Sequence, residues 1–289
     1  MYELKISFFG PFTLSFGESV LREDSLRSHK QWRLIKYLLL NRDRAVERRE
    51  LIDATFGYGA YFGESEKALN ALNAILHRAR GTLEKAGIPV HIKHLSGKYF
   101  AELPDGAEID RDCFEQLVSA VFSGGDVRSI KEKALKASEI YRGFFLDGNY
   151  FDEKNKLSGE KYHSDYKRVM SVLFGALRRE ESFSLLAKIS RRAIEIDPMC
   201  QDFYVEYIGA LLSAGDIIGA KKEYLAASEF FESKTSVIIS GEFRELGKKL
   251  DTKNETAVLL PKEYADREQA VSDAVSKVLD GAKVRISLI

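Results

Sequence analysis

Polar and basic side chains recur at helical spacing within residues 64–86. An apolar stripe of Leu69, Leu72, Leu76, Ala79 and Leu83 predicts one buried face, so the opposite face and its flanks remain for contacts. Asn can pair bidentately with adenine and Arg with guanine, and a small Ala lets a helix sit deep in the major groove. The pattern predicts a DNA-reading surface, or alternatively an ordinary solvated helix face, made of Lys67, Asn70, Asn73, Ala74, His77, Arg78 and Arg80.

Further basic residues flank this segment and have the chemistry to bind DNA phosphates. The N-terminus of a helix starting near residue 47 would add backbone N–H donors to such a contact. Taken singly, each cation also fits an unremarkable surface charge. The predicted phosphate contacts are Lys30, Arg48, Arg49, Lys93 and Lys98.

The residue types and spacings of this sequence give little support for catalytic activity or metal binding. His91 and His94 are three apart on an expected strand and should point to opposite faces, which is poor geometry for one metal ion. The sequence has no phosphate-binding Gly-Lys-Ser/Thr loop and no nucleophile elbow. We therefore expect no enzyme activity, catalytic residue, metal or cofactor.

The elements that would position the predicted DNA surface occupy residues 1–104. Alternation of apolar and polar residues predicts strands at 4–8 and 12–16, and apolar periodicity predicts helices at 28–41, 47–56 and 64–86, the first capped by Ser28. A Ser96-Gly97 turn predicts a hairpin of residues 90–94 and 98–101. This order is that of a winged helix-turn-helix with an N-terminal sheet.

A second region begins at Asp105-Gly106 and is helical, with almost no strand signal. Ala193 and Ala227 are 34 residues apart, the period of a TPR repeat, so residues 105–250 are expected to form a TPR-like helical module. Residues 251–289 follow with no role assigned: a linker at 251–256, a helix at 264–279 and a strand at 284–289. The predicted fold class is mainly α with small β elements, a winged helix followed by an all-α module.

The composition limits the kind of partner and the cellular compartment that we expect for this fold. The 289 residues carry no net charge, but residues 1–104 hold 16 Lys and Arg against 12 Asp and Glu, which favours DNA contact in the first part. No apolar run approaches the length of a membrane span, and the N-terminus does not resemble a signal peptide. Two distant cysteines, Cys113 and Cys200, fit a reducing compartment, so a cytoplasmic protein is expected.

Several motifs, in order, resemble the bacterial SARP family of transcriptional activators. In the first part these are Phe9-Gly10-Pro11-Phe12 and residues 32–42, 49–53 and 76–84. In the second they are residues 141–146, Ile196-Asp197-Pro198 and Gly215-Asp216 with Ala220. The sequence departs from the family at Phe56, where Trp is common, and at Ala79, where Leu is usual. The resemblance implies an OmpR/PhoB-type winged helix followed by a bacterial transcriptional activator domain.

The same resemblance implies function. Its third helix would read double-stranded DNA, its hairpin would be the wing, and the loop before the third helix would contact RNA polymerase. That loop carries Tyr58, Tyr61 and Phe62, whose rings suit a partner surface or alternatively fold back onto the core. The acidic balance of the helical module favours protein contacts there, including a homodimer. The competing interpretation is an interaction adaptor whose winged helix no longer binds DNA.

Overall fold

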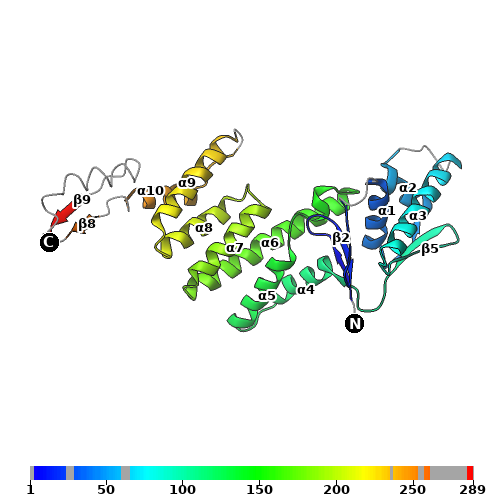
Figure 1. Ribbon diagram of the computed structural model, residues 1–289, viewed down its shortest axis with the longest axis horizontal. Coiled ribbons are helices and arrows are strands. Elements are labelled where there is room, and N and C mark those ends of the chain that lie inside the picture. The colour runs from blue at the N-terminus through cyan, green and yellow to red at the C-terminus, as the bar shows by residue number, and fades with distance from the viewer. Residues whose placement is uncertain are drawn as a thin grey trace. The chain divides into compact units, whose positions relative to one another are not determined.

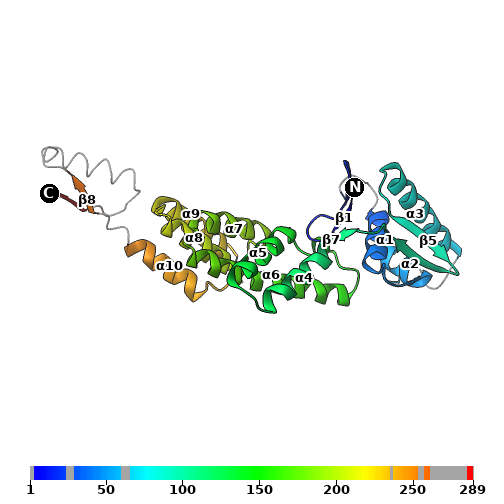
Figure 2. The ribbon, with the colours of Figure 1, turned by 90° about the horizontal axis from the view of Figure 1, so that it is seen from below.

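The computed structural model describes residues 3–23, 29–59, 66–234, 237–252, 257–260 and 285–288. It divides into two compact units, Met1–Leu173 and Phe174–Ile289 (Figures 1 and 2). This division differs from the predicted domain limits at residues 104 and 250, which remain predictions. Helix α6 (Glu153–Arg179) crosses the division between the units.

A four-stranded sheet opens the first unit. The two predicted strands are present as β1 (Leu4–Ser7) and β2 (Thr13–Phe16), which pair antiparallel. Two strands that the sequence did not predict complete the order β3-β2-β1-β7: β3 (Ser19–Arg22) and β7 (Glu108–Ile109). Strand β7 pairs parallel to β1, with Lys5 opposite Glu108, so the sheet joins segments a hundred residues apart.

The three predicted helices of the first part are confirmed with small shifts of their ends. They are α1 (His29–Leu40), α2 (Arg48–Phe56) and α3 (Glu66–Lys85); Ser28, the predicted cap, lies outside the described residues. All three helices pack against one another. Trp32 of α1, Leu51 of α2 and Leu72 of α3 are fully buried, so this small core holds the helices at fixed angles.

The predicted hairpin is also confirmed, as β5 (His91–Leu95) and β6 (Lys98–Glu102). Its two turn residues, Ser96 and Gly97, have φ of +50° and +79°, as a tight two-residue hairpin turn requires. A short strand that was not predicted, β4 (Val46–Glu47), adds to β6 just before α2. The hairpin is therefore tied to the start of α2 by backbone pairing.

The helical region after residue 105 begins with α4 (Asp110–Phe122), α5 (Val127–Ile140) and a 3-10 turn η2 (Leu146–Gly148). Helix α4 packs directly onto the N-terminal sheet, and α5 packs on α4. The buried ring of Phe9 contacts Phe114 at 5.1 Å, Tyr141 at 4.8 Å and Tyr162 at 5.6 Å between centroids. This aromatic cluster explains why the first compact unit extends well past the predicted limit at residue 104.

One buried carboxylate strengthens this junction. Asp110, at the start of α4, accepts hydrogen bonds from the backbone N–H of Phe8 (2.8 and 2.9 Å to its two oxygens) and of Phe9 (3.1 Å). Burial raises the pKa of Asp110 to about 6, although the bonds from Phe8 and Phe9 oppose that rise. A side chain from the helical region thereby accepts the hydrogen bonds of the two backbone N–H groups just after β1.

The second unit is a stack of helices, as the TPR-like pattern predicted. It contains α7 (Phe183–Ile196), α8 (Gln201–Ser213), α9 (Ile217–Glu232) and α10 (Gly241–Thr252). Consecutive helices pack against each other, and both pattern residues, Ala193 and Ala227, are buried. Small side chains there allow the close approach of paired helices. Asp216 caps α9 by accepting from the N–H of Gly219 at 2.8 Å.

The end of the chain matches the sequence in part. Helix α10 continues to Thr252, so Asp251 and Thr252, which were expected in a linker, are helical. The rest of the expected linker lies outside the described residues. Strands β8 (Ala257–Leu260) and β9 (Arg285–Leu288) pair parallel, and β9 confirms the expected terminal strand. The helix expected at 264–279 lies outside the described residues. No helix in the described part of the chain is long and apolar enough to cross a membrane.

Candidate nucleic-acid interface

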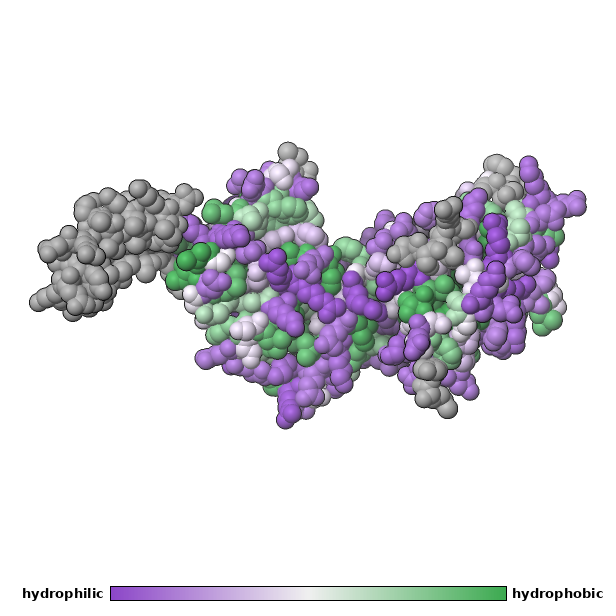
Figure 3. All heavy atoms as spheres, in the orientation of Figure 1, coloured by the Kyte–Doolittle hydropathy of each residue, from purple (hydrophilic) through white to green (hydrophobic). Residues whose placement is uncertain are grey.

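Helix α3 has one buried and one exposed face, as the sequence predicted. Its buried residues are Ala68, Leu72, Ile75, Leu76, Ala79 and Leu83. Leu69, predicted to be buried, is only half-buried, because Ala68 and Ile75 rotate the stripe slightly away from it. All seven predicted DNA-reading residues, called the polar face below, are exposed: Lys67, Asn70, Asn73, Ala74, His77, Arg78 and Arg80. In Figure 3 the winged-helix surface seen in this view, where α3 lies in Figure 1, is mostly hydrophilic.

A buried glutamine, which the sequence did not indicate as a positioning residue, fixes the position of α3 along and around its own axis. Gln31 of α1 is 4% exposed, and its side-chain N–H donates to Thr82 Oγ1 at 2.6 Å and to the carbonyl of Arg78 at 3.3 Å. The sequence signal was a polar residue beside Trp32, in a helix whose buried residues are mostly apolar. Because its amide is bonded, Gln31 holds α3 against α1 and so positions the polar face.

The two arginines of the polar face differ in their contacts. Arg80 donates from Nε to the carbonyl of Ile92 in β5 at 2.9 Å, so it connects α3 to the hairpin. Arg78 donates from Nε to the carbonyl of Ala74 at 3.2 Å, one turn back along the same helix. Arg78 thus lies along the exposed surface, whereas Arg80 is directed toward the hairpin.

The hairpin lysines are exposed and carry acidic partners. Lys93 pairs with Glu102 at 2.6 Å, and Lys98 pairs with Glu47 of β4 at 2.9 Å. The hydrogen bond from Lys93 lowers the pKa of Glu102 below its usual range. Each lysine side chain is about half exposed, so these are surface ion pairs that contribute little to stability and exchange partners readily.

The three remaining predicted phosphate contacts lie on α1 and α2. Lys30 is exposed, with its ammonium 5.2 Å from the centre of the Phe56 ring. Arg49 is exposed in the first turn of α2, whereas Arg48 is half-buried beneath the hairpin turn. A Cβ built on Gly97 would lie 3.5 Å from Arg48 Nη2. The structure therefore places Arg48 against the hairpin and leaves Lys30 and Arg49 at the surface.

The start of α2 is stabilised by a network that the sequence did not reveal. Glu50 accepts from Tyr37 Oη at 2.5 Å and from Arg44 Nη1 at 3.0 Å. The bond from Arg44 lowers the pKa of Glu50, so its carboxylate stays ionised over the physiological range. These contacts fix the α1–α2 connection, and with it the position of Arg49.

The predicted partner loop is described only at its beginning. Tyr58 is 94% exposed and lies between Gly57 and Gly59, whose φ values are +97° and +74°. Its ring does not fold back onto the core, which was the alternative for this residue. Tyr61 and Phe62 lie outside the described residues.

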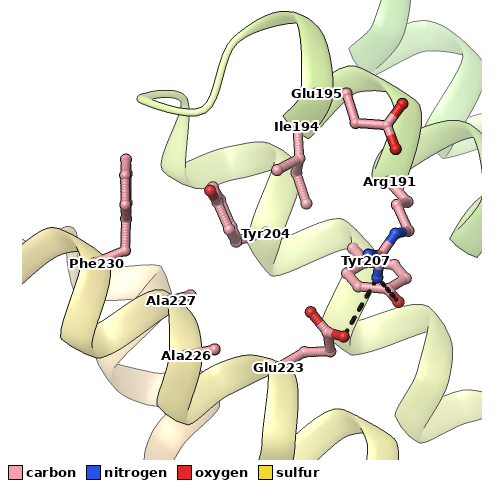
Figure 4. A pocket seen from close by; sticks show the side chains of 9 residues that line it. All are labelled: Arg191, Ile194, Glu195, Tyr204, Tyr207, Glu223, Ala226, Ala227 and Phe230. Atoms are coloured by element: carbon pink, nitrogen blue, oxygen red, sulfur yellow. Dashed lines mark hydrogen bonds and ion pairs between the residues drawn. The ribbon is translucent and has the colours of Figure 1, made fainter.

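A groove in the second unit is lined by a polar network (Figure 4). Arg191 of α7 bonds to Tyr207 Oη at 3.0 Å and to Glu223 of α9 at 3.3 Å, beside a cavity of about 240 Å³. The hydrogen bond to Tyr207 raises the pKa of Arg191, so the network links three helices through a permanent cation. Among the described residues, no group of three or more His, Cys, Asp or Glu is arranged to hold a metal ion.

Comparison with known proteins identifies the fold. Mycobacterium tuberculosis EmbR, solved in complex with a low-affinity phosphopeptide, matches 97% of this chain and 72% of its own, with a TM-score of 0.56 and 15% identity. No known family model matches the sequence, and no curated protein matches it. The likeness confirms the predicted fold class, in which a winged helix with small strands is followed by a helical module.

Proposed function

We propose that the chain is a sequence-specific, double-stranded-DNA-binding transcriptional regulator of the cytoplasm, with its DNA-binding domain in residues 1–104. The observation that carries this proposal is the polar face of α3, which is exposed on a helix that Gln31 holds against α1. The fold of the chain is similar to that of EmbR, a SARP-family regulator, and this likeness supports a regulator of that kind.

In the proposed complex, α3 enters the major groove. Arg78 would pair with guanine, Asn70 and Asn73 with adenine, and Ala74 would approach a thymine methyl. Arg80 would chiefly hold the hairpin in place through Ile92. Lys93 and Lys98 would exchange their carboxylate partners for phosphates, while Lys30 and Arg49 would contact the backbone on the other side of α3.

We expect the full chain to select a defined site from a random duplex pool. Its affinity for that site should fall linearly with salt on logarithmic axes, because each phosphate contact releases condensed counterions. Lys98→Gln should weaken binding evenly across sequences and flatten the salt slope by about one unit. Gel shifts over a salt series measure the affinity and its salt slope. If no duplex is retained even at low salt, the chain does not bind DNA through this surface.

The proposal includes activation through RNA polymerase, with the loop after α2 as the contact. Tyr58 presents nearly its whole ring to solvent, and aromatic rings give large contact area at low entropic cost. The acidic helical module would carry protein contacts, with a homodimer as the simplest arrangement.

For Tyr58→Ala we expect unchanged operator affinity and thermal stability but at least a threefold loss of transcript in a reconstituted reaction. The reason is that an exposed ring contributes nothing to the core but much to an interface. Tyr61→Ala and Phe62→Ala are tested beside it. A full transcript yield from all three stable variants would remove the loop from the mechanism.

A second function has one observation in its favour. Both hairpin lysines are neutralised by Glu47 and Glu102, which weakens the attraction of the hairpin for phosphates. An interaction adaptor with a winged helix that no longer binds DNA would retain such pairs. The low-salt gel shift separates the two functions, since the adaptor retains no duplex of any sequence.

A further inference from the structure

A cleft in the first unit lies away from the polar face of α3. It has a volume of about 670 Å³ and is bounded by the first strand β1, the short strand β7 and the helix pair α4 and α5. All of these elements belong to the same compact unit. The cleft thus lies at the junction of the N-terminal sheet and the helices after residue 105.

The two helices contribute apolar residues to this cleft at helical spacing. Leu117 and Ala120 lie three residues apart on α4, and Ile140 of α5 and Ile6 of β1 also line the cleft. These side chains give the cleft an apolar part. A ligand held there would remove that surface from water.

Two lysines at the cleft lack partners. Lys133 and Lys136 lie three residues apart on α5, and within the described residues neither makes a hydrogen bond or an ion pair. Lys133 is half-buried and Lys136 is exposed, and both line the cleft together with its apolar residues. Unpaired cations beside an apolar wall favour an anion that brings its own apolar part.

The other charges of the cleft are already engaged. Lys5 pairs with Glu108 at 3.0 Å, and Arg142 donates to Ser7 Oγ at 2.6 Å. Asp110 accepts from the backbone N–H groups of Phe8 and Phe9, the two residues that follow β1. Glu139 also has an interaction of its own. Among the described residues, Lys133 and Lys136 are therefore the charged side chains of the cleft that have no partner.

We propose that this cleft binds a small organic anion, a carboxylate or phosphate with an attached apolar group. Lys133 and Lys136 hold the anionic group, and the apolar group lies against Leu117 and Ala120. Because the ligand bridges α5 and α4, its binding stabilises the packing of these two helices. This inference does not depend on DNA binding.

The experiment uses phenyl phosphate as the probe and the full chain as it exists. Cys113 lines the cleft and Cys200 lies in the other unit, so both thiols can be followed by mass spectrometry after alkylation with iodoacetamide. Phenyl phosphate should slow alkylation of Cys113 and leave Cys200 unchanged. The double substitution Lys133→Gln and Lys136→Gln should raise the concentration needed for half-protection about tenfold, as loss of charge-assisted bonds implies.

Three controls make the result decisive. Lys131→Gln removes the same charge from α5 outside the cleft lining and should leave protection unchanged. Phenol and inorganic phosphate, each lacking half of the proposed ligand, should protect far less than phenyl phosphate. Absence of protection in the natural chain, or equal protection in the Lys133→Gln, Lys136→Gln variant, would overturn the site. Equal protection by inorganic phosphate would overturn its apolar part.

Discussion

Asp110→Ala is expected to lower the free energy of unfolding by about 2–4 kcal/mol at pH 7, because it leaves the buried N–H groups of Phe8 and Phe9 without an acceptor. Asp110 is 8% exposed, so water cannot readily replace the carboxylate. Asp110→Asn should also be destabilising, since its amide N–H₂ would face one of the two backbone donors. Urea unfolding of the first unit, followed by circular dichroism, measures the change.

The same carboxylate predicts a pH dependence. Burial raises the pKa of Asp110 from the ordinary 3.8 to about 6, so folding takes up a proton between these values. Its contribution to stability is therefore fully present below about pH 4 and is lost as pH rises through 6. Over that interval the loss amounts to about 2 kcal/mol. The advantage of the natural chain over Asp110→Ala should accordingly be larger at pH 4.5 than at pH 7 (about 2 kcal/mol at most).

Asp105→Ala supplies the matched control. Asp105 is an exposed carboxylate in the turn just before β7, so its loss should change stability little at either pH. If Asp110→Ala unfolds at the same urea concentration as Asp105→Ala, the contact between Asp110 and the end of β1 does not stabilise the junction. A pH profile identical in the two variants and the natural chain would contradict the raised pKa.

For DNA binding, Arg78→Ala should have the largest effect on the selected site. A bidentate pair with guanine discriminates by about 1–3 kcal/mol, so affinity should fall about tenfold to a hundredfold and one base position should become permissive. The fold should survive, because the carbonyl that Gln31 binds at Arg78 belongs to the backbone and remains in the variant. Repeating the duplex selection with the variant measures both affinity and preference.

Arg128→Ala is the control for charge alone. Arg128 lies on α5 with an 86% exposed side chain, so its removal changes the net charge equally without touching the polar face. We expect this variant to retain both affinity and sequence preference. An Arg78→Ala variant that selects the same site with the same affinity would remove Arg78 from base reading, and Asn70 and Asn73 would become the principal candidates.

Most of the winged helix could be predicted from local sequence patterns. The face of α3 follows from apolar spacing within a single helix, and the hairpin follows from the Ser96-Gly97 turn, so neighbouring residues suffice to predict both. Gln31 and Asp110 could not be predicted as positioning residues, because their partners lie about 50 and 100 residues away in the sequence. Strand β7 was missed for the same reason: two residues carry no alternation, and only pairing with β1 makes them a strand.

The pairing of β1 with β7 also affects how the chain folds during synthesis, because β7 leaves the ribosome long after β1. When residues 3–102 have left the ribosome, the sheet lacks its last strand, and Phe8 and Phe9 lack the carboxylate that later binds their N–H groups. An edge strand beside an unburied aromatic ring is a hazard for association with other chains. The nascent chain must keep this edge protected until α4 emerges. A fragment ending at residue 104 would keep it open permanently, whereas one ending at residue 173 would close it.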